Sequence, residues 1–122
     1  MEAQNQPAAS QDQSSGVPRR EPRFKLEVAI TVRTRTCGVL TGYTVDISES
    51  GVSAMLRIEV PLAEVVELNF ALPIGPVTVH ALVRQKSAFR YGFQFIESSA
   101  MQEVIQATCR QLAVEQLLLG DL

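Results

Sequence analysis

The stretch VELNFALPIGPVTVHALV, from Val66 to Val83, shows the pattern that decides the fold. Apolar residues alternate with polar ones before Pro73, and the alternation resumes after Pro76. The residues between the two runs are turn formers. Because successive side chains of a strand point to opposite faces, the stretch predicts a β-hairpin with one apolar face.

The same alternation recurs on both sides of this hairpin. It covers residues 27–33, 39–45 and 52–56 before the hairpin, and residues 90–95 after it. Cys37-Gly38 predicts a turn, Pro61 predicts a loop at 57–64, and Gly42 predicts a bulge or bend. Six antiparallel strands with one apolar face each can close into a barrel without exposed edges. We therefore expect an all-β fold, a six-stranded antiparallel β-barrel over about residues 25–96.

The pattern changes to a helical period after the last strand. Apolar residues recur at intervals of three and four from Met101 to Leu112, and Ser99 with Gln102 resembles a capping box. Gly120 is a plausible stop signal. These features predict a C-terminal α-helix over about residues 99–119. The three leucines at 117–119 cannot all face one groove, so contact with another subunit and a frayed end both remain open.

Length and composition indicate one domain, over residues 18–122, after a disordered tail at residues 1–17. The net charge of −2 gives no general attraction to nucleic acid or membranes. Cys37 and Cys109 lack a paired spacing, which favours free thiols. No apolar run follows a basic start or approaches the ~20 residues of a membrane helix. We therefore expect a cytoplasmic protein without membrane insertion.

A basic segment precedes the first strand. Arg19, Arg20 and Arg23 form an arm whose guanidinium groups fit phosphate oxygens and the O6 and N7 acceptors of guanine. Pro22 restricts the backbone of this arm and lowers the entropy lost when the arm becomes ordered. A local basic patch on a mildly acidic chain suits a small anion better than a nucleic-acid polymer.

The segment from Asp46 to Gly51, DISESG, carries complementary groups. The carboxylate of Asp46 can accept hydrogen bonds from the adjacent N1–H and N2–H₂ donors of guanine, and Ser48 adds a hydroxyl. Two residues apart on a strand, both side chains are expected on one face, with Ile47 pointing into the barrel. Gly51 is expected to adopt a positive φ where the chain reverses and to allow a ligand close to the backbone.

Each of these segments also has an ordinary structural interpretation. Asp-x-Ser near glycine is common turn chemistry, and arginine clusters are usually solvated surface. Their occurrence together, in this order on an all-β pattern, favours a ligand site at Arg19, Arg20, Arg23, Asp46, Ser48 and Gly51.

Enzymatic patterns are missing from the sequence. His80 falls on the outer face of a strand, the cysteines form no metal-ligand pattern, and Ser48 lacks the Gly-x-Ser-x-Gly context of a hydrolase nucleophile. We therefore expect no catalytic residues, no metal and no cofactor. Tyr91, Phe93 and Phe95 could stack on bases, but their spacing of two favours a place in the barrel core.

The two segments together resemble the motifs of the PilZ domain family. Arg19 and Arg23 match an Arg-x-x-x-Arg motif, and Asp46, Ser48 and Gly51 match an Asp/Asn-x-Ser-x-x-Gly motif. The stretch Gly92 to Phe95 is similar to the family's late Gly-x-x-Phe strand. The resemblance covers roughly residues 19–112.

This resemblance implies a bacterial receptor for the second messenger cyclic di-GMP. The arginine arm would order on the ligand, hold it against the barrel beside Asp46 and Ser48, and create a surface for a protein partner. Pro18 before the first motif arginine favours one bound ligand, whereas Arg20 would allow a stacked pair. Alternatives are a ligand-independent PilZ-like protein-interaction adaptor and, less well supported, a single-stranded nucleic-acid binder. The oligomeric state stays open.

Overall fold

The computed structural model of this chain describes residues 21–96 and 100–120, so the predicted tail at 1–17 lies outside it. The described elements are β1 (Phe24–Lys25), β2 (Ala29–Arg33), β3 (Val39–Ile47), β4 (Gly51–Leu56), β5 (Val65–Leu72), β6 (Gly75–Ser87), β7 (Arg90–Phe95), the helix α2 (Ala100–Val114) and the π-helical segment η2 (Glu115–Gly120). All strand pairings are antiparallel.

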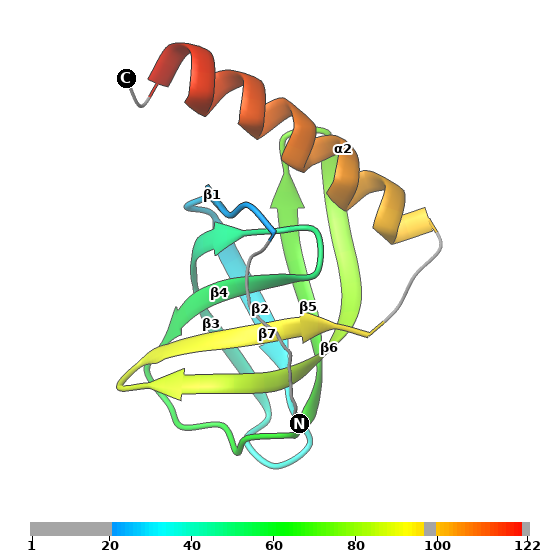
Figure 1. The fold of residues 1–122 in the computed structure, drawn as a ribbon. Coiled ribbons are helices and arrows are strands. Elements are labelled where there is room, and N and C mark those ends of the chain that lie inside the picture. The colour runs from blue at the N-terminus through cyan, green and yellow to red at the C-terminus, as the bar shows by residue number, and fades with distance from the viewer. Residues whose placement is uncertain (1–20, 97–99, 121–122) are drawn as a thin grey trace, which may run out of the picture.

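The six longer strands form a closed barrel (Figure 1). Their order is β3-β2-β5-β6-β7-β4, and β4 pairs back with β3. The expected six-stranded antiparallel barrel with a C-terminal helix is therefore confirmed. The two-residue strand β1 is an addition, since it pairs only with the end of β3 and stays outside the ring.

The predicted hairpin forms from β5 and β6. Leu72 pairs with Gly75, which leaves Pro73 and Ile74 as a two-residue turn. Gly75 has a φ of 153°, a conformation that favours glycine. Alternate side chains of both strands are buried, as the period of two requires.

The barrel interior is filled by aliphatic and aromatic side chains, including those of β7. Tyr91, Phe93 and Phe95 are buried, which confirms their predicted place in the core. The hydroxyl of Tyr91 accepts a hydrogen bond from the Val60 N–H at 3.0 Å and so anchors the loop at 57–64. This bond satisfies a polar group that burial would otherwise leave unpaired.

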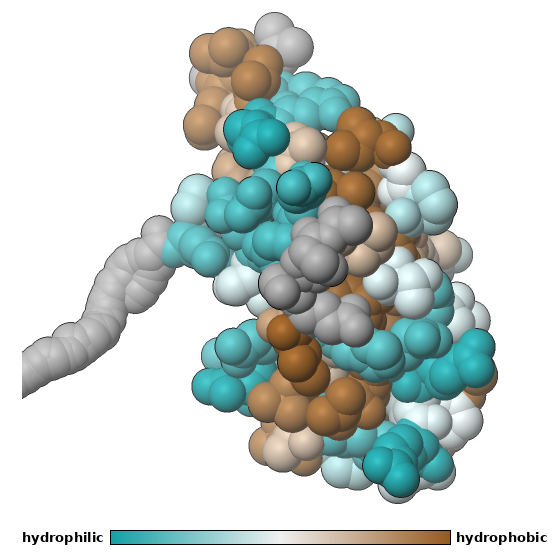
Figure 2. Space-filling model, turned by 90° about the vertical axis from the view of Figure 1, so that its right-hand side faces the viewer, coloured by the Kyte–Doolittle hydropathy of each residue, from teal (hydrophilic) through white to brown (hydrophobic). Residues whose placement is uncertain are grey.

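Helix α2 lies across one end of the barrel (Figure 1) and packs against β6 and β1. Its buried side chains Ile105, Cys109 and Leu112 join the barrel core. The segment η2 continues the helix and exposes Leu117 and Leu118. One face of the molecule shows hydrophilic and hydrophobic side chains interspersed, with hydrophobic groups at the helical end (Figure 2). Neither α2 nor η2, the described helical segments, is long and apolar enough to span a bilayer.

Two glycines of the early strands have different roles. Gly38 has a φ of 75° and closes the predicted turn, where the Thr34 N–H donates to the Gly38 carbonyl at 2.8 Å. The prediction of a bulge or bend at Gly42 is wrong, because the irregularity in β3 lies between Thr44 and Asp46. A Cβ at Gly42 would stand 2.1 Å from the Met55 carbonyl oxygen. Gly42 is therefore required by the close approach of β4.

Candidate functional site

The carboxylate of Asp46 lies at the centre of the candidate site. Arg23 donates to Oδ1 from Nε at 3.0 Å and from Nη2 at 2.8 Å. Arg90 donates to Oδ2 from Nη2 at 2.9 Å. The Asp46 side chain is 17% exposed, whereas the side chains of Arg23 and Arg90 are about half exposed. One carboxylate thus joins the chain before β1 to the first residue of β7.

The end of the arginine arm lies against the β3–β4 turn. Glu21 Oε1 accepts hydrogen bonds from the Ser50 hydroxyl at 2.7 Å and from the Ser50 N–H at 3.3 Å. Arg23 Nη2 also donates to the Ser53 hydroxyl at 3.0 Å. Arg19 and Arg20, the other two predicted arm residues, lie outside the described residues.

The continuation of the arm, β1, is held on both of its edges. Lys25 pairs with Asp46 across the β1–β3 ladder. On its other edge the Lys25 N–H donates to Gln116 Oε1 at 3.0 Å, and Gln116 Nε2 donates to the Lys25 carbonyl at 2.8 Å. The side-chain amide of Gln116 therefore takes the place of a neighbouring strand and ties the arm to η2.

The turn between β3 and β4 buries Ser48. The Ser48 N–H donates to the Gly51 carbonyl at 2.8 Å, and the Ser48 hydroxyl is directed at the same carbonyl at 3.4 Å. Ile47 is fully buried as expected, but Ser48 is fully buried as well. Asp46 therefore points outward as expected. The Ser48 side chain does not share this outward face, because its hydroxyl is directed into the turn.

Gly51 is extended, so the expectation of a positive φ at this position is wrong. The described glycines with a positive φ are Gly38 and Gly75. Gly51 pairs regularly with Gln94, and a Cβ there would stand 2.3 Å from the Phe93 carbonyl oxygen. The absence of a side chain therefore permits the close contact between β4 and β7.

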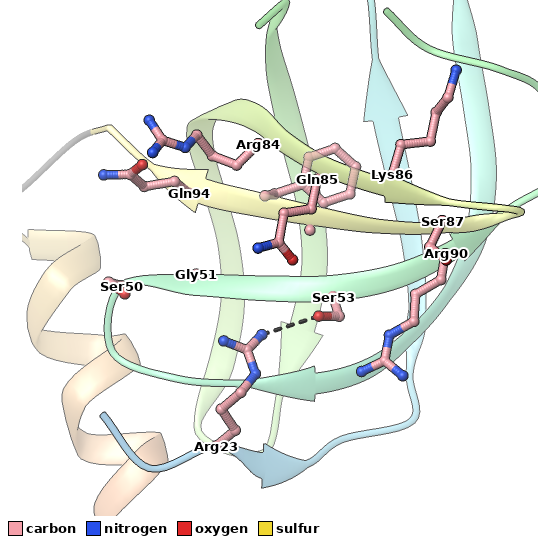
Figure 3. Close-up of a pocket in the computed structure, with 12 residues that line it drawn as sticks. Arg23, Ser50, Gly51, Ser53, Arg84, Gln85, Lys86, Ser87, Arg90 and Gln94 are labelled. Atoms are coloured by element: carbon pink, nitrogen blue, oxygen red, sulfur yellow. Dashed lines mark hydrogen bonds between the residues drawn. The ribbon is translucent and has the colours of Figure 1, made fainter. Parts of the chain in front are cut away.

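A groove of about 990 Å³ lies beside this cluster, across β4, β7 and β6 (Figure 3). It is lined by Arg23, Ser50, Gly51, Ser53, Arg84, Gln85, Lys86, Ser87, Arg90, Gly92, Phe93 and Gln94. Its described lining contains four cationic side chains and no carboxylate. Such a surface attracts a small anion.

The groove has two sides. The arm side consists of Arg23 and Ser53 in the lining, together with Asp46, which binds Arg23 from outside the lining, and the hairpin side consists of Gln85, Arg90 and Gly92. In Figure 3 the Arg23 side chain rises toward Ser53, and Gln85 extends from β6 toward β4. The arm side contains two residues predicted from the sequence. The hairpin side was missed, because Arg90 and Gln85 carried no signal beyond an outward position on a strand.

Two arginines that follow the arm in the sequence, Arg33 and Arg35, make contacts elsewhere. Arg33 pairs with Glu67 at 3.2 Å. The Arg35 N–H donates to Glu64 at 2.9 Å, and this hydrogen bond is the main cause of the lowered pKa of Glu64. Neither arginine lines the groove.

Candidate reactive groups lie apart from the groove. His80 is exposed on β6, and Cys37 is half-buried. Burial raises the pKa of Cys109 to about 11, with smaller contributions from Glu49 and Glu21. Within residues 21–96 and 100–120, no cluster of three or more His, Cys, Asp or Glu side chains is arranged to hold a metal ion.

The sequence profile of the PilZ domain matches residues 18–111. The chain belongs to the PilZ domain family. This match spans both predicted motifs and the strand that supplies Arg90. No curated protein matches the chain.

Solved structures of PilZ domains share this fold. The PilZ domain of YcgR from Escherichia coli, solved with c-di-GMP, has a TM-score of 0.60 at 15% identity and covers 83% of this chain and 98% of its own. The PilZ domain of CeSA from a cellulose-synthesizing bacterium has a TM-score of 0.58 at 17% identity, with coverages of 75% and 94%. The c-di-GMP complex of MrkH from K. pneumonia has a TM-score of 0.69 at 19% identity, and the match covers 82% of this chain but 53% of MrkH.

Proposed function

We propose that this PilZ domain is a cyclic di-GMP receptor with a binding and not a catalytic role. Its ligand-binding residues are Arg19, Arg20, Arg23, Asp46, Ser48 and Gly51. The observation that carries the proposal is the contact of Arg23 with Asp46 at the edge of a cationic groove. YcgR and MrkH, which share the fold, were solved with c-di-GMP.

The chemistry of the arm side suits a guanine nucleotide. A guanidinium group can bind phosphate oxygens or the O6 and N7 acceptors of guanine, and a carboxylate can accept from N1–H and N2–H₂. Before the ligand binds, Arg23 and Asp46 neutralise each other. On binding, both exchange this contact for contacts with the ligand, so neither charged group is left without a hydrogen-bond partner.

Signalling to a protein partner would begin in the arm. Ligand binding orders Arg19 and Arg20 and rearranges the contacts of Glu21 and Arg23. Because Lys25 is hydrogen-bonded to Gln116, this rearrangement reaches η2, where Leu117 and Leu118 are exposed. A segment that becomes ordered on a ligand converts binding into a new surface for a partner.

Calorimetric titration with cyclic di-GMP, with GTP as the control, tests the proposed ligand. We expect saturable binding of cyclic di-GMP and at least tenfold weaker binding of GTP. If neither nucleotide binds, the receptor proposal fails and the ligand-independent adaptor is favoured. Equal affinities would contradict recognition of the cyclic dinucleotide.

Limited trypsin digestion tests the behaviour of the arm, because trypsin cleaves after arginine. Saturating cyclic di-GMP is expected to slow cleavage after Arg19, Arg20 and Arg23. Cleavage after Arg57, in the loop that follows β4, provides a control for general stabilisation. Unchanged cleavage within the arm at saturation would contradict ordering on the ligand.

A further inference from the structure

Arg90 is the member of the Asp46 cluster that is most available for exchange. Arg23 is bound to both Asp46 and Ser53, whereas Arg90 is bound to Asp46 alone among the described residues. Arg90 follows a two-residue turn, in which Ala88 has a φ of 56°. Its guanidinium group is half exposed and can leave the carboxylate without breaking a second contact.

The floor of the groove beside Arg90 is flat because of Gly92. In the sheet, Gly92 pairs with Ser53 on β4 and with Gln85 on β6. A Cβ added at Gly92 would lie 3.4 Å from the Gln85 Cβ and 3.5 Å from its Oε1, so a methyl group would fit in ordinary contact with the Gln85 side chain. The Gln85 side chain therefore lies over Gly92. An amide presents a donor and an acceptor, which suits the edge of a base.

We propose that the hairpin side binds the second half of the dinucleotide. Arg90 leaves Asp46 and binds a phosphate, and the second guanine takes the place over Gly92 from which the Gln85 side chain turns aside, so that the Gln85 amide meets one edge of the base. This inference rests on the proposed function. It follows from the ligand's chemistry, because cyclic di-GMP carries two phosphates and two guanines, and the arm side offers one carboxylate for one guanine.

The two halves of the site are coupled through Asp46. Arg23 occupies Oδ1 and Arg90 occupies Oδ2, so both oxygens are taken before binding. When a phosphate draws Arg90 away, Oδ2 becomes free to accept from a guanine N–H. A cyclic dinucleotide can place one guanine at Asp46, a phosphate at Arg90 and a second guanine on the hairpin side, whereas a mononucleotide has no second guanine.

Titration of Arg90→Ala with cyclic di-GMP tests the inference. We expect affinity to fall about ten- to hundredfold, since a charge-assisted hydrogen bond is lost. Arg33→Ala is the matched control, because Arg33 is also an exposed strand arginine paired with a carboxylate, but lies outside the groove. Its affinity should stay within twofold of the wild type. Affinity within twofold for Arg90→Ala would overturn the inference.

Two further variants separate direct binding from an effect through Asp46. Gly92→Ala places a methyl group on the floor at an ordinary contact distance, and Gln85→Ala removes the amide. Each is expected to weaken cyclic di-GMP binding at least threefold while melting close to the wild type. If both bind normally although Arg90→Ala is impaired, Arg90 acts only by positioning Asp46 and the hairpin site is overturned. If the wild type does not bind, the proposed function itself has failed, and the inference fails with it.

Discussion

The arm side and the hairpin side of the groove each contribute one arginine that binds the carboxylate of Asp46, but the two arginines occur in different sequence contexts. Arg23 and Arg90 contact Asp46 at 2.8 and 2.9 Å. Arg23 belongs to a recognisable motif before the first strand, while Arg90 begins the last strand and belongs to no motif. Strand pairing across the closed barrel brings Arg90 to the site. A site can thus be half visible in a sequence and half created by topology.

The largest expected effect is a difference in the free energy of unfolding between alanine variants of two glycines, Gly51 on β4 and Gly92 on β7. Gly51→Ala should lower the free energy of unfolding by about 3 kcal/mol, because its Cβ would stand 2.3 Å from the Phe93 carbonyl oxygen and force the backbone to shift. Gly92→Ala should cost less than about 1 kcal/mol, since its nearest contact is 3.4 Å. Chemical denaturation measures both. Equal losses of stability would contradict the tight backbone packing assigned to Gly51 and the looser packing assigned to Gly92.

Removal of a residue from the arm side should impair binding without unfolding the barrel. Arg23→Ala and Asp46→Ala are each expected to weaken cyclic di-GMP binding by about a hundredfold, or roughly 2.7 kcal/mol. Arg23 is half exposed and Asp46 faces the groove edge, so thermal melting should change little. Calorimetry and melting curves measure the two effects. Wild-type affinity in either variant would remove that residue from the site.

The contact between η2 and the arm should have a smaller effect. Gln116→Ala removes the amide that pairs with both backbone groups of Lys25. We expect about fivefold weaker cyclic di-GMP binding, because β1 is less well held beside Asp46. Gln111→Ala, which removes a half-buried side chain of α2 whose amide donates to Glu115 and does not contact the arm, is the control. If both variants bind cyclic di-GMP with equal affinity, the contact between η2 and the arm does not contribute to ligand binding.

A further expected effect is a dependence of the free energy of unfolding on pH through Cys109. Its pKa is raised to about 11 from 9.0, so the folded state retains a proton that the unfolded state loses. Stability from this group is complete below pH 9 and is lost as the pH rises from 9 to 11. Denaturation at pH 8, 9 and 10 should show a decline that is absent in Cys109→Ala. Glu21→Gln should weaken the decline slightly, because Glu21 raises this pKa from the arm.

Much of the fold followed from the sequence because a period of two is a local property. Alternation identified the six long strands and the core positions of Tyr91, Phe93 and Phe95. Strand β1 was missed, since two residues show no period. The roles of Gly42 and Gly51 were missed for another reason. Both are set by carbonyl groups of neighbouring strands, which the local sequence does not contain.

The candidate site likewise has a part that the sequence predicted and a part that it did not. Arg23 and Asp46 were assigned to one site because motif residues carried complementary charges, but their direct contact was not predicted. The buried position of the Ser48 hydroxyl was not, since it depends on how the β3–β4 turn closes. Arg90 and Gln85 could not be assigned from the sequence, and Gly92 was noted only as part of a family-like strand, because their places in the site arise when β7 pairs with β4 and β6.

Backbone amide chemical shifts recorded during a titration with cyclic di-GMP test the central claim most directly. The account predicts large changes on both sides of the groove, in residues 21–25, 46–53 and 84–94, and little change in β2 and β5 on the far part of the barrel. Changes confined to other surfaces, or no changes at saturating ligand, would contradict a ligand site between the arm and the hairpin.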